Sequence, residues 1–166
     1  HRDLKPANLF LTTRPNGTPC VKVLDFGISK QVTPDAVDLT KTGNVLGSPL
    51  YMSPEQMART KDADARSDIW SMGIVFYELL TGTVPFFADT ITEVVARVLQ
   101  EEPLPPSQVR PNISPAIDAV VAKCLEKRPA QRFQSILELA AALRAVAHPA
   151  DVRAPQVHDA RQSRPQ

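Results

Sequence analysis

Helical patterning with sharp ends is the feature that most constrains the fold of this chain. Its second half carries apolar residues at helical spacing, and a glycine or a proline follows each helical stretch. Proline cannot continue a helix, and glycine readily adopts the left-handed conformation that closes one. We therefore expect a mainly helical domain with helices over residues 67–80, 90–100, 114–126 and 133–147. The Ser114 hydroxyl, just before Pro115, is expected to cap the third helix.

A small β-hairpin is expected ahead of these helices. Residues 9–11 and 21–24 are β-prone runs, and the Asn16-Gly17 pair between them is a strong hairpin signal. Residues 29–53 show little periodicity and much Thr, Pro, Gly and Asp, which predicts a long functional loop. The residues after His148 carry almost no large apolar side chains, so they cannot bury enough surface to fold. We therefore divide the chain into a domain over 1–147 and a disordered linker over 148–166.

Composition excludes several classes of function. The chain is 43% hydrophobic but only 5% aromatic, which suits a helical domain better than an all-β one. Lysine plus arginine number 19 and aspartate plus glutamate 18, so the net charge indicates no nucleic-acid partner. Cys20 and Cys124 stand far apart without a metal-binding pattern and are expected to be reduced thiols. The longest apolar stretch, residues 69–80, is too short to cross a bilayer, so we expect no membrane contact within the chain.

Two polar motifs flank the predicted hairpin. The chain opens on His1-Arg2-Asp3-Leu4-Lys5-Pro6-Ala7-Asn8, and Asp25-Phe26-Gly27 follows the second β-prone run. The first motif resembles the catalytic loop of protein kinases, with its asparagine five places after the aspartate, and the second resembles the tripeptide that follows it in that family. With the later motifs described below, the chain resembles a eukaryotic-like, bacterial-type serine/threonine protein kinase.

The resemblance assigns roles to individual residues. It implies that Asp3 accepts or orients the proton of the substrate hydroxyl, and that Asn8 and Asp25 hold the metal ions. It places Lys5 near the transferred phosphate, a pattern of kinases that act on serine and threonine. The implied cofactors are ATP and Mg²⁺, or Mn²⁺, and the implied reaction is transfer of the γ-phosphate to protein hydroxyls. In such a reaction the protein contributes mainly positioning and electrostatic stabilisation, and little covalent chemistry.

The resemblance covers the large lobe of the kinase fold, which is mainly helical with a small hairpin beside the catalytic loop. The glycine-rich loop, the lysine that pairs with the phosphates and the hinge that receives adenine are not found in these residues. The chain also begins at the catalytic loop without methionine or a leader. We therefore expect that the small lobe is absent, that it is the natural partner of this chain, and that the chain alone transfers no phosphate.

The residues between Asp25 and Glu55 resemble a kinase activation segment. It closes on Ser53-Pro54-Glu55, where the family usually has alanine in place of the serine. Ser48 stands where the family usually has a threonine whose hydroxyl bridges the catalytic aspartate and lysine. Thr40 and Thr42 stand where bacterial relatives carry paired autophosphorylation sites. We hypothesise that phosphate there activates the enzyme.

Three further residues are expected to organise this segment and the catalytic loop. The resemblance implies that Arg2 binds the phosphate of a phosphothreonine in the activation segment. Asp68 is expected to bond the backbone of the catalytic loop from the start of the central helix. Arg132 is expected to pair with Glu55, and removal of one partner of a deeply buried pair costs about 3–5 kcal/mol.

Two other functions remain open alongside the protein kinase. A pseudokinase would be a binding scaffold without turnover, but such proteins commonly lose the catalytic or metal-binding aspartate, and Asp3, Asn8 and Asp25 are all present. A small-molecule kinase of this fold seldom keeps the long docking loop that ends in Ser53-Pro54-Glu55. We expect protein substrates and a cytoplasmic location. The resemblance also allows a homodimer for autophosphorylation and a membrane anchor beyond the tail, whereas the substrate and the stimulus cannot be read from these residues.

Overall fold

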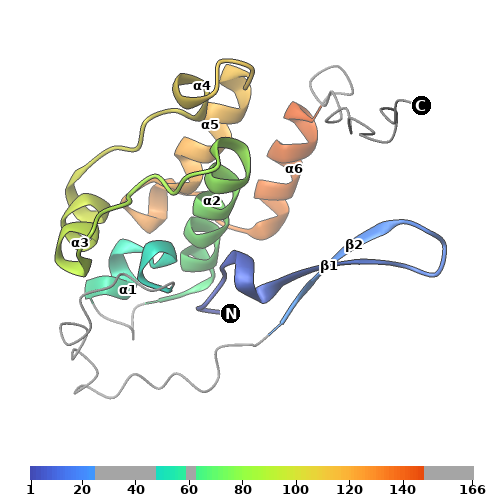
Figure 1. Ribbon diagram of the computed structural model, residues 1–166, viewed down its shortest axis with the longest axis horizontal. Coiled ribbons are helices and arrows are strands. Elements are labelled where there is room, and N and C mark those ends of the chain that lie inside the picture. The colour runs from blue at the N-terminus through green and yellow to red at the C-terminus, as the bar shows by residue number, and fades with distance from the viewer. Residues whose placement is uncertain (25–47, 59–62, 148–166) are drawn as a thin grey trace, which may run out of the picture.

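The computed structural model describes residues 1–24, 48–58 and 63–147 (Figure 1). Asp25, Thr40, Thr42 and the linker over 148–166 lie outside the described residues, and so does the side chain of Ser48. The elements in chain order are η1 (Pro6–Asn8), β1 (Leu9–Thr13), β2 (Pro19–Val23), η3 (Ser48–Tyr51), α1 (Pro54–Ala58), α2 (Ala65–Thr81), α3 (Ile91–Gln100), α4 (Pro106–Val109), α5 (Pro115–Cys124), η5 (Pro129–Gln131) and α6 (Ile136–Val146). A mainly helical fold with a small hairpin is therefore confirmed.

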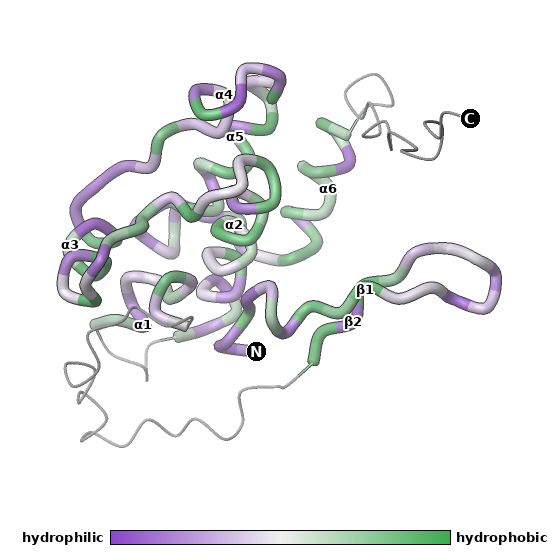
Figure 2. Tube along the Cα trace, viewed as in Figure 1, coloured by the Kyte–Doolittle hydropathy of each residue, from purple (hydrophilic) through white to green (hydrophobic). Residues whose placement is uncertain are grey.

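The hairpin formed by β1 and β2 extends from the helical body in Figure 1. The strands pair antiparallel, with Leu9 opposite Val23 and Thr13 opposite Pro19. At the turn, Gly17 has a φ of 82°, a conformation that glycine adopts without steric cost, and its N–H donates to the Arg14 carbonyl. Figure 2 shows a hydrophilic tip and hydrophobic strand bases. The sequence signal at Asn16-Gly17 therefore identified the turn.

Helix α2 is the centre of the helical body. It begins after Asp64, whose side chain accepts a hydrogen bond from the Arg66 N–H, and it ends at Gly82, which has a φ of 83°. Its buried side chains join two clusters with the other helices. The larger cluster contains Trp70, Ile74, Tyr77, Phe86, Ala88, Val94, Val98, Val121 and Leu125, and the smaller contains Ile69, Val120, Cys124, Phe133 and Leu139. Over the described residues, no helix combines the length and the hydropathy needed to span a membrane.

The start of α5 lies where it was expected, but the proposed cap is wrong. Pro115 is the first residue of the helix, whereas the Ser114 hydroxyl makes no capping hydrogen bond and is buried without a partner among the described residues. The proline fixes φ at a helical value and removes one N–H that would need an acceptor, so it sets the boundary without the hydroxyl.

The last helix begins later than residue 133. Phe133 is 6% exposed and belongs to the smaller core cluster, and it follows the short helix η5. The Ser135 side chain accepts a hydrogen bond from the Glu138 N–H and caps α6, which therefore starts at Ile136. Burial of Phe133 and the cap at Ser135 override the helical spacing at residues 133–135.

Gly73 marks a close approach of α2 to the end of α5. A Cβ added there would lie 2.6 Å from Cys124 Cβ and 2.9 Å from Leu125 Cδ2. We expect Gly73→Ala to lower the free energy of unfolding by about 1–3 kcal/mol through overpacking, although alanine favours a helix by about 1 kcal/mol. Urea unfolding of the domain measures the change. Leu79→Ala, at a site 72% exposed on the same helix, is the control and should change little; equal or greater stability of Gly73→Ala would contradict the close contact.

Candidate active site

The opening residues bring Asp3, Lys5 and Asn8 together. Pro6 starts helix η1, and the Asn8 N–H donates to the Lys5 carbonyl, so the chain turns back on itself after Asp3. The buried Asn8 side chain donates from Nδ2 to the Asp3 carbonyl at 2.7 Å and to Asp3 Oδ2 at 3.3 Å. Lys5 Nζ lies 3.1 Å from the same Oδ2. The Asp3 carboxylate thus lies between an amide and an ammonium group.

The backbone before Asp3 is held in an uncommon conformation. Arg2 has a φ of 68°, a left-handed value that costs a residue with a Cβ roughly 1–2 kcal/mol. Its N–H donates to Asp68 Oδ1 at 2.8 Å, and the His1 backbone nitrogen lies 2.9 Å from Asp68 Oδ2. Because Asp68 lies in the first turn of α2, the centre of the core is connected directly to this loop. The contact expected between Asp68 and the loop backbone is present.

Hydrogen bonds also link the loop to the hairpin. His1 Nε2 lies 3.0 Å from the Leu24 carbonyl oxygen, and the Leu24 N–H donates to the Asn8 carbonyl at 2.8 Å. Leu24 directly precedes Asp25 in the sequence. The end of β2 is therefore bonded to the same loop that carries Asp3, although Asp25 itself lies outside the described residues.

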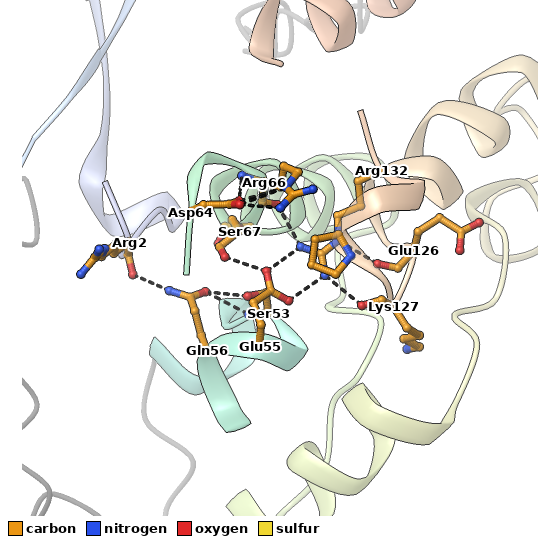
Figure 3. Close-up of polar contacts among 12 residues, drawn as sticks. Arg2, Ser53, Glu55, Gln56, Asp64, Arg66, Ser67, Glu126, Lys127 and Arg132 are labelled. Atoms are coloured by element: carbon orange, nitrogen blue, oxygen red, sulfur yellow. Dashed lines mark hydrogen bonds and ion pairs between the residues drawn. The ribbon is translucent and has the colours of Figure 1, made fainter. Parts of the chain in front are cut away.

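A buried ion pair connects α1 to the region after α5. Arg132 donates from Nη1 to Glu55 Oε1 at 2.7 Å and from Nη2 to Glu55 Oε2 at 2.8 Å, as Figure 3 shows. The other donors of the guanidinium reach the backbone carbonyls of Glu126 at 2.8 Å, Arg66 at 2.9 Å and Lys127 at 3.1 Å. The Arg132 side chain is fully buried, and the contact expected between it and Glu55 is present.

The Glu55 carboxylate is held in its charged form. Burial alone would raise its pKa, but the hydrogen bonds from Arg132 and from the Ser67 hydroxyl outweigh burial and lower the pKa to about 2. The carboxylate is therefore ionised wherever the domain is folded at neutral or mildly acidic pH. A bidentate pair of this kind fixes the orientation of α1 as well as its position.

Gln56 is a residue of the site that the sequence patterns did not single out. Its Nε2 donates to the Arg2 carbonyl at 3.1 Å, and its Oε1 accepts from the Ser53 N–H at 3.0 Å and from the Ser53 hydroxyl at 3.1 Å (Figure 3). The only signal available was its place after Ser53-Pro54-Glu55. Its partner is a backbone carbonyl far away in the sequence, and no side-chain pattern reports such a partner.

Lys127 is a second feature that was not foreseen. Its Nζ is buried, has no hydrogen-bond partner among the described residues and lies 4.3 Å from the ring centroid of Phe86 and 5.3 Å from that of Trp70. Burial lowers its pKa, and the negative faces of the stacked rings partly replace the lost hydration. The guanidinium of Arg132 also lies over Trp70, at 5.1 Å. These contacts stabilise the packing around Trp70 and help to hold Arg132 in place for its ion pair with Glu55.

The chemistry of the loop suits a hard divalent cation. The Asn8 amide nitrogen is engaged with Asp3, so the amide oxygen is the atom of this side chain that could bind a cation, and Mg²⁺ prefers such oxygen ligands. Over the described residues, no group of three or more His, Cys, Asp or Glu side chains could hold a metal ion. A cation held by one or two protein oxygens and by substrate phosphates is the usual arrangement for Mg²⁺.

Comparison with known proteins shows similarity along most of the chain. Residues 1–149 match the family described as the protein kinase domain. The chain is 46% identical over 143 residues to serine/threonine-protein kinase PknB of Mycobacterium leprae, an alignment that covers 86% of this chain and 22% of that protein. It is 42% identical over 157 residues to PknB of Mycobacterium tuberculosis, covering 95% of this chain and 24% of that protein. It is 45% identical over 150 residues to serine/threonine-protein kinase pkn3 of Myxococcus xanthus, covering 88% and 27%. The chain thus spans roughly a quarter of the length of these relatives.

Proposed function

We propose, from the premise that this chain belongs to the protein kinase family, that the complete protein transfers the γ-phosphate of ATP to serine and threonine hydroxyls of proteins. The observation that carries the proposal is the cluster of Asp3, Lys5 and Asn8 around one carboxylate. Three relatives named serine/threonine-protein kinases support the same substrate class.

In the proposed mechanism, the Asp3 carboxylate accepts or orients the proton of the attacking hydroxyl. Lys5, whose Nζ is 3.1 Å from Asp3 Oδ2, places positive charge beside the carboxylate, where it would stabilise the negative charge spread over the oxygens of the transferred phosphoryl group. Asn8, through its oxygen, and Asp25 would hold Mg²⁺. When bound, the cation neutralises the charge on the phosphate oxygens. Asn8 also orients Asp3 through its two hydrogen bonds.

We propose that Thr40 and Thr42 are autophosphorylation sites and that Arg2 binds the phosphate. Support comes from their place in the loop, from the exposed position of Arg2, and from the charge-assisted hydrogen bonds that phosphate forms with arginine. We propose in addition that the Ser48 hydroxyl bridges the catalytic aspartate and lysine. Family resemblance also supports three further proposals. The protein is cytoplasmic, this chain packs against a small lobe that binds ATP, and the protein forms a homodimer that autophosphorylates.

A peptide assay tests the proposed function. The complete protein is incubated with labelled ATP, Mg²⁺ and three peptides that differ only in a central serine, threonine or tyrosine. We expect label on the serine and threonine peptides and none on the tyrosine peptide. The polypeptide of residues 1–166 is expected to label none of them, because it includes no glycine-rich loop over the phosphates.

Two results would contradict these proposals. Absence of label on every peptide and on the protein itself would favour a binding scaffold over a kinase. Strong labelling by residues 1–166 alone would show that the small lobe is dispensable. Mass spectrometry of the labelled protein addresses the loop: autophosphorylation that spares both Thr40 and Thr42 would exclude them as the switch.

A further inference from the structure

The two peptide groups that flank Arg2 are each held by a different part of the chain. The N–H of Arg2 donates to Asp68 at the start of α2, and the Arg2 carbonyl accepts from Gln56 Nε2 in α1. Arg2 has a left-handed φ, so it depends on such contacts to keep its conformation. The Arg2 carbonyl belongs to the same rigid peptide plane as the Asp3 nitrogen. Gln56 therefore acts on the backbone from which the Asp3 side chain projects.

The other end of the Gln56 side chain is anchored in a buried place. Its oxygen accepts from both the N–H and the hydroxyl of Ser53, a residue with 0% exposure. Next to it in α1, Glu55 is held by the buried Arg132 (Figure 3). An amide flipped by half a turn would place its NH₂ against the Ser53 N–H and its oxygen against the Arg2 carbonyl. The contacts thus define one orientation of the Gln56 amide.

We propose that Gln56 is a positioning residue for Asp3: it transmits the anchored position of residues 53–56 to the peptide that precedes the catalytic base. The inference rests on the proposed kinase function. It implies that residues 53–56 affect turnover through a hydrogen bond, in addition to any effect on how substrate binds.

Two substitutions separate the two ends of the Gln56 side chain. Gln56→Glu keeps an oxygen for Ser53 but places a carboxylate against the Arg2 carbonyl, so it breaks only the link to the catalytic loop. Gln56→Met keeps the length and removes both links. Gln108→Glu, at an exposed position on α4, is the matched control for the change of charge.

We expect Gln56→Glu in the complete protein to lower kcat about tenfold, the effect of one lost hydrogen bond on the catalytic geometry. The KM values for ATP and peptide should stay within about twofold, because the Ser53 anchor remains. Gln56→Met should lower kcat and also raise the peptide KM. Gln108→Glu should change neither kcat nor the KM values. A purely structural role would instead lower the unfolding midpoint of Gln56→Glu while leaving kcat of the folded fraction unchanged, and that result would overturn the proposal.

Amide hydrogen exchange distinguishes failure of this inference from failure of the proposed function. Exchange of the catalytic-loop peptide should be faster in Gln56→Glu than in Gln108→Glu, whether or not the protein is an active kinase. If exchange is faster in Gln56→Glu but the protein transfers no phosphate, the proposed function is wrong and the positioning contact is supported. If the protein is an active kinase and Gln56→Glu changes neither exchange nor kcat, the inference about Gln56 is wrong and the proposed function stands.

Discussion

Replacement of Arg132 by alanine is expected to lower the free energy of unfolding by about 3–5 kcal/mol, the usual cost of stranding one partner of a buried ion pair. The Glu55 carboxylate, 13% exposed, would lose two charge-assisted hydrogen bonds and keep the one from the Ser67 hydroxyl. The carbonyls of Arg66, Glu126 and Lys127 would lose a donor as well. The space vacated beside Trp70 adds a packing loss.

Denaturant unfolding of the complete protein measures this change, and Arg66→Ala provides a matched control. Arg66 lies 2.6 Å from Asp64, but this pair is exposed, with side chains 31% and 49% accessible. Exposed pairs contribute about 0–1 kcal/mol. Equal losses in the two variants would contradict a stabilising role for burial of the pair. Arg132→Lys, which keeps the charge but not the two parallel bonds, should fall between them.

Replacement of Asp3 by asparagine is expected to reduce kcat by a factor on the order of 10²–10⁴, the usual contribution of a positioned acid or base. Asparagine has nearly the same shape, and the bond from Asn8 Nδ2 to the residue 3 carbonyl does not depend on the carboxylate. The fold should therefore persist, while the side chain can no longer take the substrate proton or pair with Lys5 as an anion.

Steady-state kinetics on a serine peptide measures this effect, with the unfolding midpoint of each variant as the test of folding. Asp89→Asn makes the same chemical change at an exposed position and should keep full activity. If the folded Asp3→Asn protein kept more than about a tenth of the turnover, Asp3 would not be the group that handles the proton. That outcome would leave the family assignment intact.

The long elements of this fold were predictable because local chemistry determines them. Gly17 supplies the positive φ of the hairpin loop, and Gly82 ends α2 with a left-handed φ. The cap at Thr90, which accepts from the Glu93 N–H, starts α3 where expected. In each case the residues that decide the boundary lie within a few positions of it.

The parts that escaped prediction depend on distant contacts. Helices α1 and α4 contain five and four residues, too few to produce a helical pattern, and they form because tertiary contacts hold them. Charge predicts a solvated Lys127, yet its ammonium group is buried against the rings of Trp70 and Phe86. Gln56 contacts a backbone carbonyl, which every residue has, so its partner left no mark on the sequence.

The Arg132 ion pair also bears on the order in which the domain folds. Glu55 and Arg132 are separated by 77 positions, and closing a loop of that length costs roughly 4 kcal/mol of chain entropy before the pair can form. The guanidinium forms all of its hydrogen bonds only when α1, the start of α2 and the segment after α5 have come together, because each of them provides an acceptor. We therefore expect this contact to form late, after the helices around α2 have packed. We expect its main kinetic effect to be slower unfolding, so that residues 53–56 keep their position once the native state is reached.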